Sequence, residues 1–243
     1  MIAFIDAEYN CDEARTQMYL LEVGLLICEE TKKNINVVKT YHTYVQLPEG
    51  QKIYSRITDL TGITEDTIQQ GVVFQESFLK LAQLLEQYNV TKVYCYGNFD
   101  KIAFEWNCRK AHITKSFRKK VLPLFCNMEV TVRTRWELKE SISLYGALYL
   151  YSYEVVSKHN ALEDAKSLQM LYAFLKQTPI PKLLRSYQRY CKERECFRAY
   201  KNLQQRVTQL GCSFADFQSI LDDETKNRKY LTFEECLDRI GIL

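Results

Sequence analysis

The spacing of the apolar residues changes partway along this chain, and the change restricts the fold more than any other feature. Three early runs, at residues 2–7, 19–28 and 37–45, are short and apolar, partly β-branched or alternating, which is typical of strands. Pro48 and Gly50 end the third run. Three strands in succession predict an antiparallel meander.

Beyond the third strand the apolar residues recur with the period of a helix. The first such helix is predicted from these positions: Phe74, Phe78, Leu81, Leu85 and Tyr88. A strand-like run at 93–96 follows, and then a second unit places Ala103, Phe104 and Trp106 on a helix before a buried run at 121–125. This order predicts an α/β fold whose mixed sheet, flanked by helices, is antiparallel in its first three strands and parallel afterwards.

A strong helix signal covers residues 161–175. Asn160 can cap the start of this helix, and Glu163 stands at the reciprocal position of a capping box. Three more helical patterns follow towards the end of the chain. We therefore expect a principal domain at residues 1–178 and an all-helical appendage at residues 179–243.

The composition excludes several classes of protein. The 33 basic and 30 acidic side chains give a net charge of +3, which is too weak a field for a protein that coats nucleic acid. The 9 cysteines include no C-x-x-C pair, and the start of the chain lacks the basic residues of a signal peptide, so we expect reduced thiols and a cytoplasmic protein. No segment is long and apolar enough to span a bilayer, so we expect no membrane partner.

Two carboxylates continue the apolar face of the first predicted strand. Strand alternation places Asp6 and Glu8 on the same face as Ile2 and Phe4. Ligands bind at the carboxyl ends of strands in open α/β sheets, and paired acidic oxygens suit Mg²⁺ or Mn²⁺. The simpler alternative is a strand that emerges into solvent at Asp6.

A third carboxylate, Asp100, follows the strand at residues 93–96. Gly97 turns the chain after that strand and Asn98 can cap the next helix, so we expect Asp100 at the same edge of the sheet. As an alternative, an aspartate in the first turn of a helix serves only to complement the helix dipole.

Asp164 and His159 lie at the start of the helix that Asn160 caps. Helical spacing aligns Asp164 with an apolar row that should face the sheet. The row consists of Leu168, Leu171 and Leu175. Burying an unpaired carboxylate destabilises the fold by several kcal/mol unless a cation or hydrogen bonds compensate its charge. In the alternative interpretation, the Asp164 side chain reaches out to water and complements the helix dipole. His159 suits proton transfer near neutrality. Alternatively, a lone histidine at a helix start is more often a surface residue. His42 and His112 are not expected to have acidic neighbours comparable to those of His159.

No single alternative explains all five side chains. Four acidic residues and one imidazole converge on one edge of the predicted sheet. Two hard cations held by carboxylates can activate a water molecule and stabilise the leaving oxygen in phosphodiester hydrolysis. The joint pattern therefore predicts a metal-dependent nuclease.

These residues resemble the motifs of a known family, the DEDDh exonucleases of the ribonuclease-H-like fold. The D-x-E motif is matched at residues 6–8, the central aspartate by G-N-F-D at 97–100, and the H-x-x-x-x-D motif by H-N-A-L-E-D at 159–164. The segment L-T-G-I-T at 60–64 is similar to the loop that the family places between the sheet and the next helix, near the 3′-terminal nucleotide, and is equally consistent with a Gly-terminated turn before a threonine cap. The likeness covers about residues 1–178 and is greatest to the Eri-type and KapD-like branch.

The resemblance implies a ribonuclease-H-like sheet and a two-metal active site. Asp6 would bridge two Mg²⁺ or Mn²⁺ ions, Glu8 and Asp164 would complete one site, and Asp100 would support the other, partly through water. His159 would be the general base for the water that attacks the terminal phosphodiester, with release of a nucleoside 5′-monophosphate. Substrate contacts are expected from Ala7, Tyr9, Leu60, Thr61 and Asn98. The metal ligands match the family pattern, whereas relatives often carry a small or different residue where Tyr9 stands, which bears on the shape of the terminal-base pocket.

The predicted appendage combines basic and aromatic side chains with an apolar stripe. Its first helix contains these basic residues: Arg185, Arg189, Lys192, Arg194, Arg198, Lys201 and Arg206. Such a face can bind phosphates and stack bases, and the apolar stripe can instead dock the helix on a core with the charges in solvent.

The leading prediction is a 3′-to-5′ exonuclease that acts on the 3′ ends of single-stranded nucleic acid, RNA or DNA. The alternative is an exonuclease-fold subunit that acts mainly as a tethered proofreading, processing or interaction module, with a protein partner bound through residues 182–243. A third hypothesis is a catalytically silent nucleic-acid-binding module on the same fold. The sequence leaves the choice between RNA and DNA open.

Overall fold

The structure, a computed structural model, describes residues 1–181 except 13, 15, 33, 154 and 156–158, together with 184, 185, 187 and 188. The description below concerns the first of the two units into which the chain divides, Met1–Lys182. The predicted helical appendage and its basic first helix therefore lie almost entirely outside the described residues.

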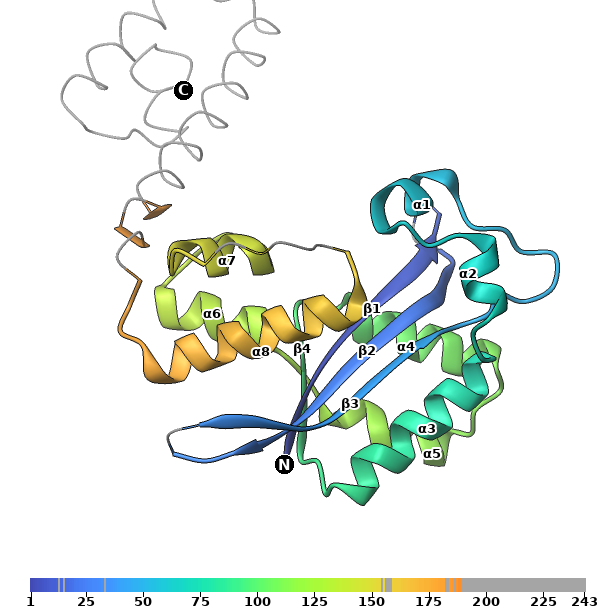
Figure 1. The fold of residues 1–243 in the computed structure, drawn as a ribbon, viewed down its shortest axis with the longest axis horizontal. Coiled ribbons are helices and arrows are strands. Elements are labelled where there is room, and N and C mark those ends of the chain that lie inside the picture. The colour runs from blue at the N-terminus through green and yellow to red at the C-terminus, as the bar shows by residue number, and fades with distance from the viewer. Residues whose placement is uncertain are drawn as a thin grey trace, which may run out of the picture. The chain divides into compact units, whose positions relative to one another are not determined.

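One five-stranded sheet organises this unit (Figure 1). Its strands in chain order are β1 (Ile2–Cys11), β2 (Met18–Glu30), β3 (Ile35–Tyr44), β4 (Lys92–Cys95) and β5 (Phe125–Asn127). The spatial order is β3-β2-β1-β4-β5, antiparallel from β1 to β3 and parallel from β1 through β4 to β5. The predicted mixed sheet, an antiparallel meander followed by parallel strands, is confirmed.

Helices cover both faces of the sheet. In chain order they are α1 (Ser55–Thr61), α2 (Glu65–Gln69), α3 (Phe74–Gln87), α4 (Phe99–Lys110), α5 (Lys115–Val121), α6 (Met128–Trp136), α7 (Leu144–Leu150) and α8 (Ala161–Gln177). Figure 1 shows α3, α4 and α5 on one side of the sheet and α6, α7 and α8 on the other. This arrangement is the α/β fold that the change of period predicts.

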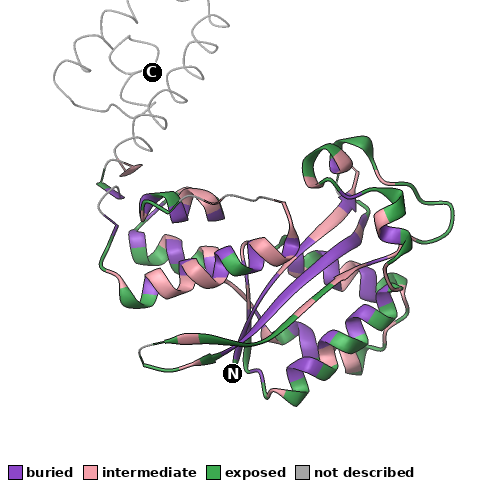
Figure 2. Cartoon of the chain, viewed as in Figure 1, coloured by how far each residue is buried: buried purple, intermediate pink, exposed green. Residues whose placement is uncertain are grey.

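The side chains of β1 alternate between these two layers. Ala3, Ile5 and Ala7 join the core that β1 forms with α3 and α4, in which Phe78 and Phe104 are fully buried. Figure 2 shows that buried residues predominate along the central strands. On the opposite face Phe4 packs edge-on against Tyr172 of α8, with ring centroids 5.3 Å apart. Since side chains two apart share a face, Asp6 and Glu8 continue towards the start of α8, as predicted.

Glycine 24 lets α8 approach the sheet closely. A Cβ atom at Gly24 would lie 2.3 Å from the backbone carbonyl carbon of Ala161, so a larger residue in β2 would displace the first turn of the helix. Gly24 is also the β2 partner of Asp6. The start of α8 therefore rests on the sheet beside the first carboxylate of the D-x-E motif.

The buried run at residues 121–125 is not the strand that its apolar character predicts. Val121 ends α5, and Leu122–Leu124 form a 3₁₀ turn that leads into β5 at Phe125. Pro123 explains the difference, because proline lacks the N–H that a central strand must donate and its ring fixes φ near the helical value.

The segment at residues 60–64 also differs from its predicted place between the sheet and a helix. Leu60 and Thr61 end α1, Gly62 takes a left-handed conformation (φ 74°) as the helix C-cap, and Thr64 caps α2 by accepting a hydrogen bond from the Thr67 N–H. The segment thus joins two short helices. Among the described residues, none of the helices is long and apolar enough to cross a membrane.

Candidate active site

The D-x-E motif lies in the middle of β1, where three elements meet. Asp6 is paired with Gly24 of β2, and Glu8 stands opposite Glu22. A β-bulge follows directly, since the register shifts between Glu8 and Tyr9. Bulges bend a strand and re-aim its side chains, and this one comes immediately after the second carboxylate.

The central aspartate is tied to this strand by a hydrogen bond. Strand β4 ends at Cys95, Gly97 turns the chain with φ 87°, and Asp100 falls in the first turn of α4. Because β4 pairs with β1 only as far as Phe4, the N–H of Ala7 is available and donates to Asp100 Oδ1 at 3.2 Å. Asp100 is only 5% exposed, so this bond is made in a buried setting.

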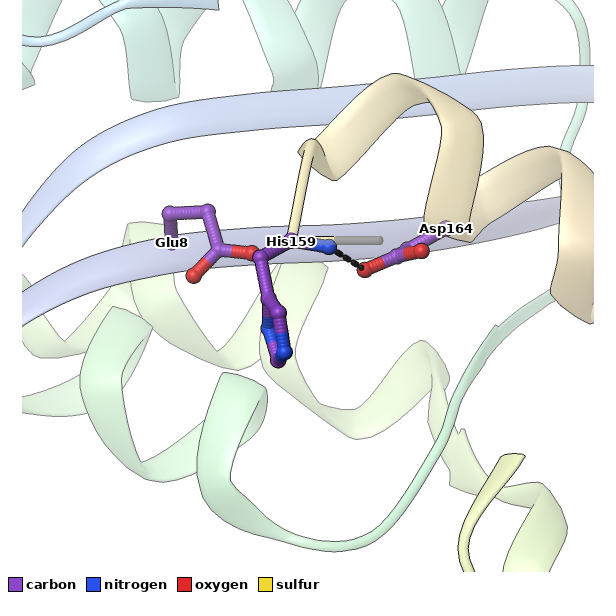
Figure 3. Close-up of side chains that lie close together, drawn as sticks. All are labelled: Glu8, His159 and Asp164. Carbon is purple, nitrogen blue, oxygen red and sulfur yellow. Dashed lines mark hydrogen bonds between the residues drawn. The ribbon is translucent and has the colours of Figure 1, made fainter. Parts of the chain in front are cut away.

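The third carboxylate and the histidine come from the start of α8. Asn160 caps the helix as predicted, by accepting a hydrogen bond from the Glu163 N–H. Asp164 is 5% exposed and lies above the buried row of Leu168, Leu171 and Leu175, which confirms the predicted apolar face. Its Oδ2 accepts a hydrogen bond from the His159 N–H at 3.1 Å (Figure 3).

These separate stretches of chain meet at one place. A ligand atom of each of Glu8, His159 and Asp164 lies within 4.8 Å of the others, and Figure 3 shows the three side chains side by side. Asp6 and Asp100 belong to the same group, since the negative charges of Asp100 and Asp164 both act on Asp6. The five residues that sequence spacing singled out are therefore brought together.

Negative charge is concentrated in this group of buried side chains, and the pKa values of its carboxylates show the effect. Burial, and then the neighbouring carboxylates with Asp100 first, raise the pKa of Asp6 well above its ordinary value of 3.8. Burial, followed by the charges of Asp164 and Glu22, raises the pKa of Glu8 from 4.5 to about 8. Within the described part of the chain, no lysine or arginine forms an ion pair with any of the four carboxylates.

The pKa values of the remaining two carboxylates shift in the same direction, but hydrogen bonds oppose the shift. Burial raises the pKa of Asp100 from 3.8 to about 7, although the hydrogen bond from Ala7 opposes the change. Burial also raises the pKa of Asp164, against the hydrogen bonds from Tyr145 and His159. Hard divalent cations prefer carboxylate oxygens and would neutralise this concentration of charge, so the donor set fits them.

The residues predicted to contact the substrate differ in their burial and in their hydrogen-bond partners. Ala7 uses its N–H to hold Asp100, and Tyr9 packs partly buried against the core. Leu60 is 52% exposed on α1, and the Thr61 hydroxyl is engaged with the Ile57 carbonyl and the Ile63 N–H. Helix α1 packs beside β1. Contact with a substrate stays a prediction for Ala7, Tyr9, Leu60 and Thr61.

Asn98 does not use its side chain as the predicted helix cap. It is the N-cap residue of α4, but its φ and ψ of −107° and −9° are not the extended values that aim a capping side chain at the helix. The Asn98 Oδ1 instead accepts a hydrogen bond from Asn127 Nδ2 at 3.2 Å. Asn127 also accepts from the Gly97 N–H at 3.0 Å, so it braces the turn that carries Asp100.

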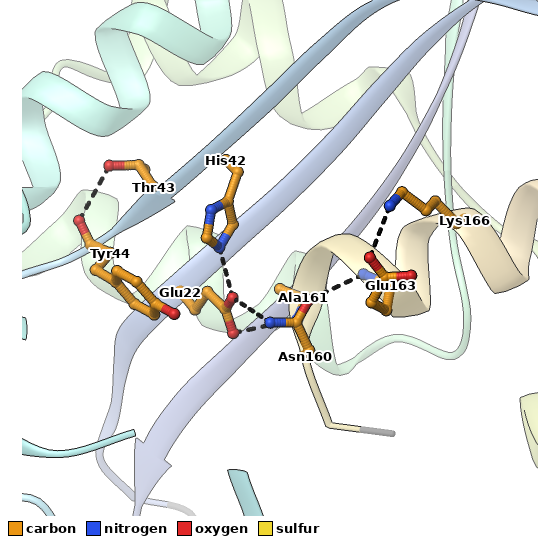
Figure 4. A network of polar contacts seen from close by, with 8 residues as sticks. All are labelled: Glu22, His42, Thr43, Tyr44, Asn160, Ala161, Glu163 and Lys166. Carbon is orange, nitrogen blue, oxygen red and sulfur yellow. Dashed lines mark hydrogen bonds and ion pairs between the residues drawn. The ribbon is translucent and has the colours of Figure 1, made fainter. Parts of the chain in front are cut away.

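A fifth carboxylate, Glu22, was not singled out from the sequence. It is 1% exposed, and its two oxygens accept hydrogen bonds from Asn160 Nδ2 at 3.1 Å and from the Ala161 N–H at 3.2 Å (Figure 4). His42 on β3 contacts the same carboxylate through Nε2 at 2.6 Å, so the expectation that His42 lacks comparable neighbours was wrong. Glu22 therefore joins the sheet to the first turn of α8, where an anion is favoured by unpaired N–H groups and the helix dipole.

Replacing Glu22 with Gln should lower the free energy of unfolding by about 1–3 kcal/mol, because the amide cannot accept from both donors of α8 and leaves a buried N–H unpaired. Denaturant titration in EDTA measures the change. Glu29→Gln, at an exposed position of the same strand, is the matched control and should have little effect. Equal losses in the two variants would contradict the bracing role.

The fold and this site define a class of protein. The family profile of the RNase T type exonucleases matches residues 3–172. The chain belongs to this exonuclease family, and its carboxylates and histidine give it the DEDDh form of the family motifs. Membership implies divalent metal ions, in agreement with the donor set.

Particular relatives agree with this placement. The chain is 25% identical over 146 residues to the probable 3′-5′ exonuclease KapD of Bacillus subtilis (strain 168), covering 58% of this chain and 67% of that protein. In structure it is similar to the nuclease domain of 3′hExo, a DEDDh family member, bound to rAMP (TM-score 0.61, 16% identity, 73% of this chain and 92% of that one). It is also similar to E. coli Exonuclease I in complex with a dT13 oligonucleotide (TM-score 0.59, 12% identity, 77% of this chain and 42% of that one). These two likenesses show the fold.

Proposed function

We propose that this protein is a 3′-to-5′ exonuclease that removes nucleotides from the 3′ end of single-stranded nucleic acid and releases nucleoside 5′-monophosphates. The observation that carries the proposal is the convergence of Asp6, Glu8, Asp100 and Asp164 with His159, without a paired cationic side chain among the described residues. Family membership and the likeness to a probable 3′-5′ exonuclease support it.

The four carboxylates are proposed to hold two divalent cations, Mg²⁺ or Mn²⁺. Asp6, on which the charges of Asp100, Asp164 and Glu8 all act, would be shared. Glu8 and Asp164 would serve one cation, and Asp100 the other. When bound, such cations supply a Lewis acid that activates water and stabilises the leaving oxygen. The Ala7 N–H fixes Asp100, and the His159 N–H fixes Asp164, so the chain itself orients two of the four ligands.

His159 is proposed to take the proton of the attacking water. Its imidazole lies with Glu8 and Asp164 in the same cluster, and its backbone is anchored by Asp164. Histidine exchanges protons near neutral pH, which suits a general base. Ala7, Tyr9, Leu60, Thr61 and Asn98 are proposed to contact the terminal nucleotide.

Either nucleic acid is compatible with this proposal. Relatives in the fold are known bound to rAMP and to a dT13 oligonucleotide, which are ligands of those proteins. Discrimination depends on contacts to the 2′-hydroxyl in the terminal pocket. The alternative of a tethered interaction module is not favoured by the comparisons, and it depends on residues 182–243, which lie almost entirely outside the described part of the chain.

A labelled-oligonucleotide assay tests the proposed activity. Single-stranded RNA and DNA carrying a 5′ label, incubated with the protein and Mn²⁺, should shorten stepwise from the 3′ end, and uniformly labelled strands should yield nucleoside 5′-monophosphates. EDTA should stop the reaction, and a 3′-phosphate should slow it. Internal cleavage at early times, shortening from the 5′ end, or unchanged activity in EDTA would contradict the proposal.

A further inference from the structure

Tyr145 contacts the active site from α7, outside the segments at residues 6–8, 60–64, 97–100 and 159–164 that match the family motifs. Its hydroxyl donates a hydrogen bond to Asp164 Oδ1 at 2.7 Å and also accepts from the His159 N–H at 3.4 Å. Its ring stands nearly perpendicular to the His159 imidazole, at 86° with centroids 6.2 Å apart. One side chain thus touches both functional residues at the start of α8.

The hydrogen bonds of Asp164 leave its orientation little freedom. Oδ1 accepts from Tyr145 and Oδ2 accepts from the His159 N–H, so each oxygen is held by a protein donor. A carboxylate offers about four lone-pair sites, and one on each oxygen remains for a cation. Outer hydrogen bonds of this kind fix the orientation of a metal-binding side chain.

The backbone of His159 also depends on hydrogen bonds to neighbouring side chains. It has φ 60°, in the left-handed region that a residue other than glycine adopts only at a cost in free energy. Such conformations persist where surrounding contacts over-determine them. Here the N–H of His159 is held by Asp164 and Tyr145, and the imidazole packs against the Tyr145 ring.

We propose that Tyr145 is a positioning residue of the active site, whose hydroxyl orients Asp164 towards the cation and whose ring and hydroxyl hold His159 in its left-handed conformation. The proposal deepens the proposed nuclease function and rests on it for the roles of Asp164 and His159. Tyr145 acts through these two residues.

Tyr172 offers a matched control. Its hydroxyl donates to Glu30 Oε1 at 2.7 Å, the same length as the Tyr145–Asp164 bond, but it joins α8 to the end of β2, outside the carboxylate cluster. Tyr145→Phe and Tyr172→Phe therefore each remove one tyrosine–carboxylate hydrogen bond and keep the ring.

Three measurements on the full chain compare the two variants: the affinity for Mn²⁺ by calorimetry, kcat and KM on a short oligonucleotide, and the NMR resonance of the His159 amide. In Tyr145→Phe, Mn²⁺ affinity and kcat should each fall roughly 10- to 100-fold with KM little changed, and the amide resonance should move. Tyr172→Phe should leave all three close to wild type. Mn²⁺ affinity and kcat that match those of Tyr172→Phe would overturn the proposal.

A double-mutant cycle keeps the proposal testable if Tyr145→Phe also weakens the fold. If the hydroxyl acts through Asp164, its removal should lower the free energy of unfolding less in the Asp164→Asn background than in wild type. Equal losses in the two backgrounds would overturn the positioning role.

The Mn²⁺ and NMR measurements need no nuclease activity, so they separate this inference from the proposed function. An inactive wild type with Tyr145-dependent Mn²⁺ binding would refute the proposed function alone, and an active wild type indifferent to Tyr145→Phe would refute this inference alone.

Discussion

Asp6→Asn should lower kcat by about 10³-fold or more, and it should at the same time raise the thermal midpoint of the protein measured in EDTA. Activity falls because Asp6 is the carboxylate proposed to serve both cations, and loss of a cation removes several kcal/mol of transition-state stabilisation. Stability rises because burial and the neighbouring carboxylates raise the pKa of Asp6, so the folded protein must either hold a repelled charge or take up a proton at this position, and asparagine requires neither.

The opposite directions of the two changes distinguish this result from simple unfolding. Asp66→Asn, at an exposed position in the first turn of α2, is the control and should retain activity. A rate assay on a labelled oligonucleotide and a thermal scan of the same samples are sufficient. An Asp6→Asn protein that keeps wild-type kcat would refute the role of Asp6.

Raising the pH should destabilise the protein in EDTA and should do so much less with Mn²⁺ present. The pKa of Glu8 is raised from 4.5 to about 8 and that of Asp100 from 3.8 to about 7, so the folded protein keeps protons that the unfolded chain releases. The stability that these two groups contribute is therefore fully present below the unfolded pKa values and is lost as the pH rises through the folded ones, over a window of about pH 4 to 8.

Thermal midpoints at several pH values check this dependence. In EDTA the midpoint should fall by several degrees across the window, since each kcal/mol corresponds to roughly 2–4 °C in a chain of this size. Mn²⁺ binds the ionised carboxylates and should raise the midpoint most at the alkaline end. A midpoint in EDTA that is flat or rises with pH would show that the carboxylates do not repel one another as described.

The parts of the site that depend on local spacing were predictable from the sequence. Strand alternation placed Asp6 and Glu8 on one face, and helical spacing placed Asp164 above an apolar row. The Asn160 cap followed from the side-chain chemistry of helix starts, and the structure has it. Each of these features is specified within a few residues of chain, where period and propensity act.

The features that sequence did not reveal depend on contacts between distant segments. In the sequence, Glu22 is only an acidic residue in a predicted strand. Its role depends on Asn160, which lies 138 residues further along the chain and contacts it only in the folded protein. Tyr145 lies on a short helix, and only the folded chain brings its hydroxyl to Asp164. The expectation of a strand at residues 121–125 was wrong for a local reason, because Pro123 cannot donate a ladder hydrogen bond and favours the 3₁₀ turn at Leu122–Leu124.

The direct test of the two-cation site is a crystal structure of the protein grown with Mn²⁺ and measured at a wavelength where manganese scatters anomalously. Two anomalous peaks should lie about 3.5–4 Å apart, with oxygens of Asp6, Glu8, Asp100 and Asp164 roughly 2 Å from one or both peaks or joined to them through water. Absence of anomalous density between these carboxylates at saturating Mn²⁺ would contradict the proposed metal centre.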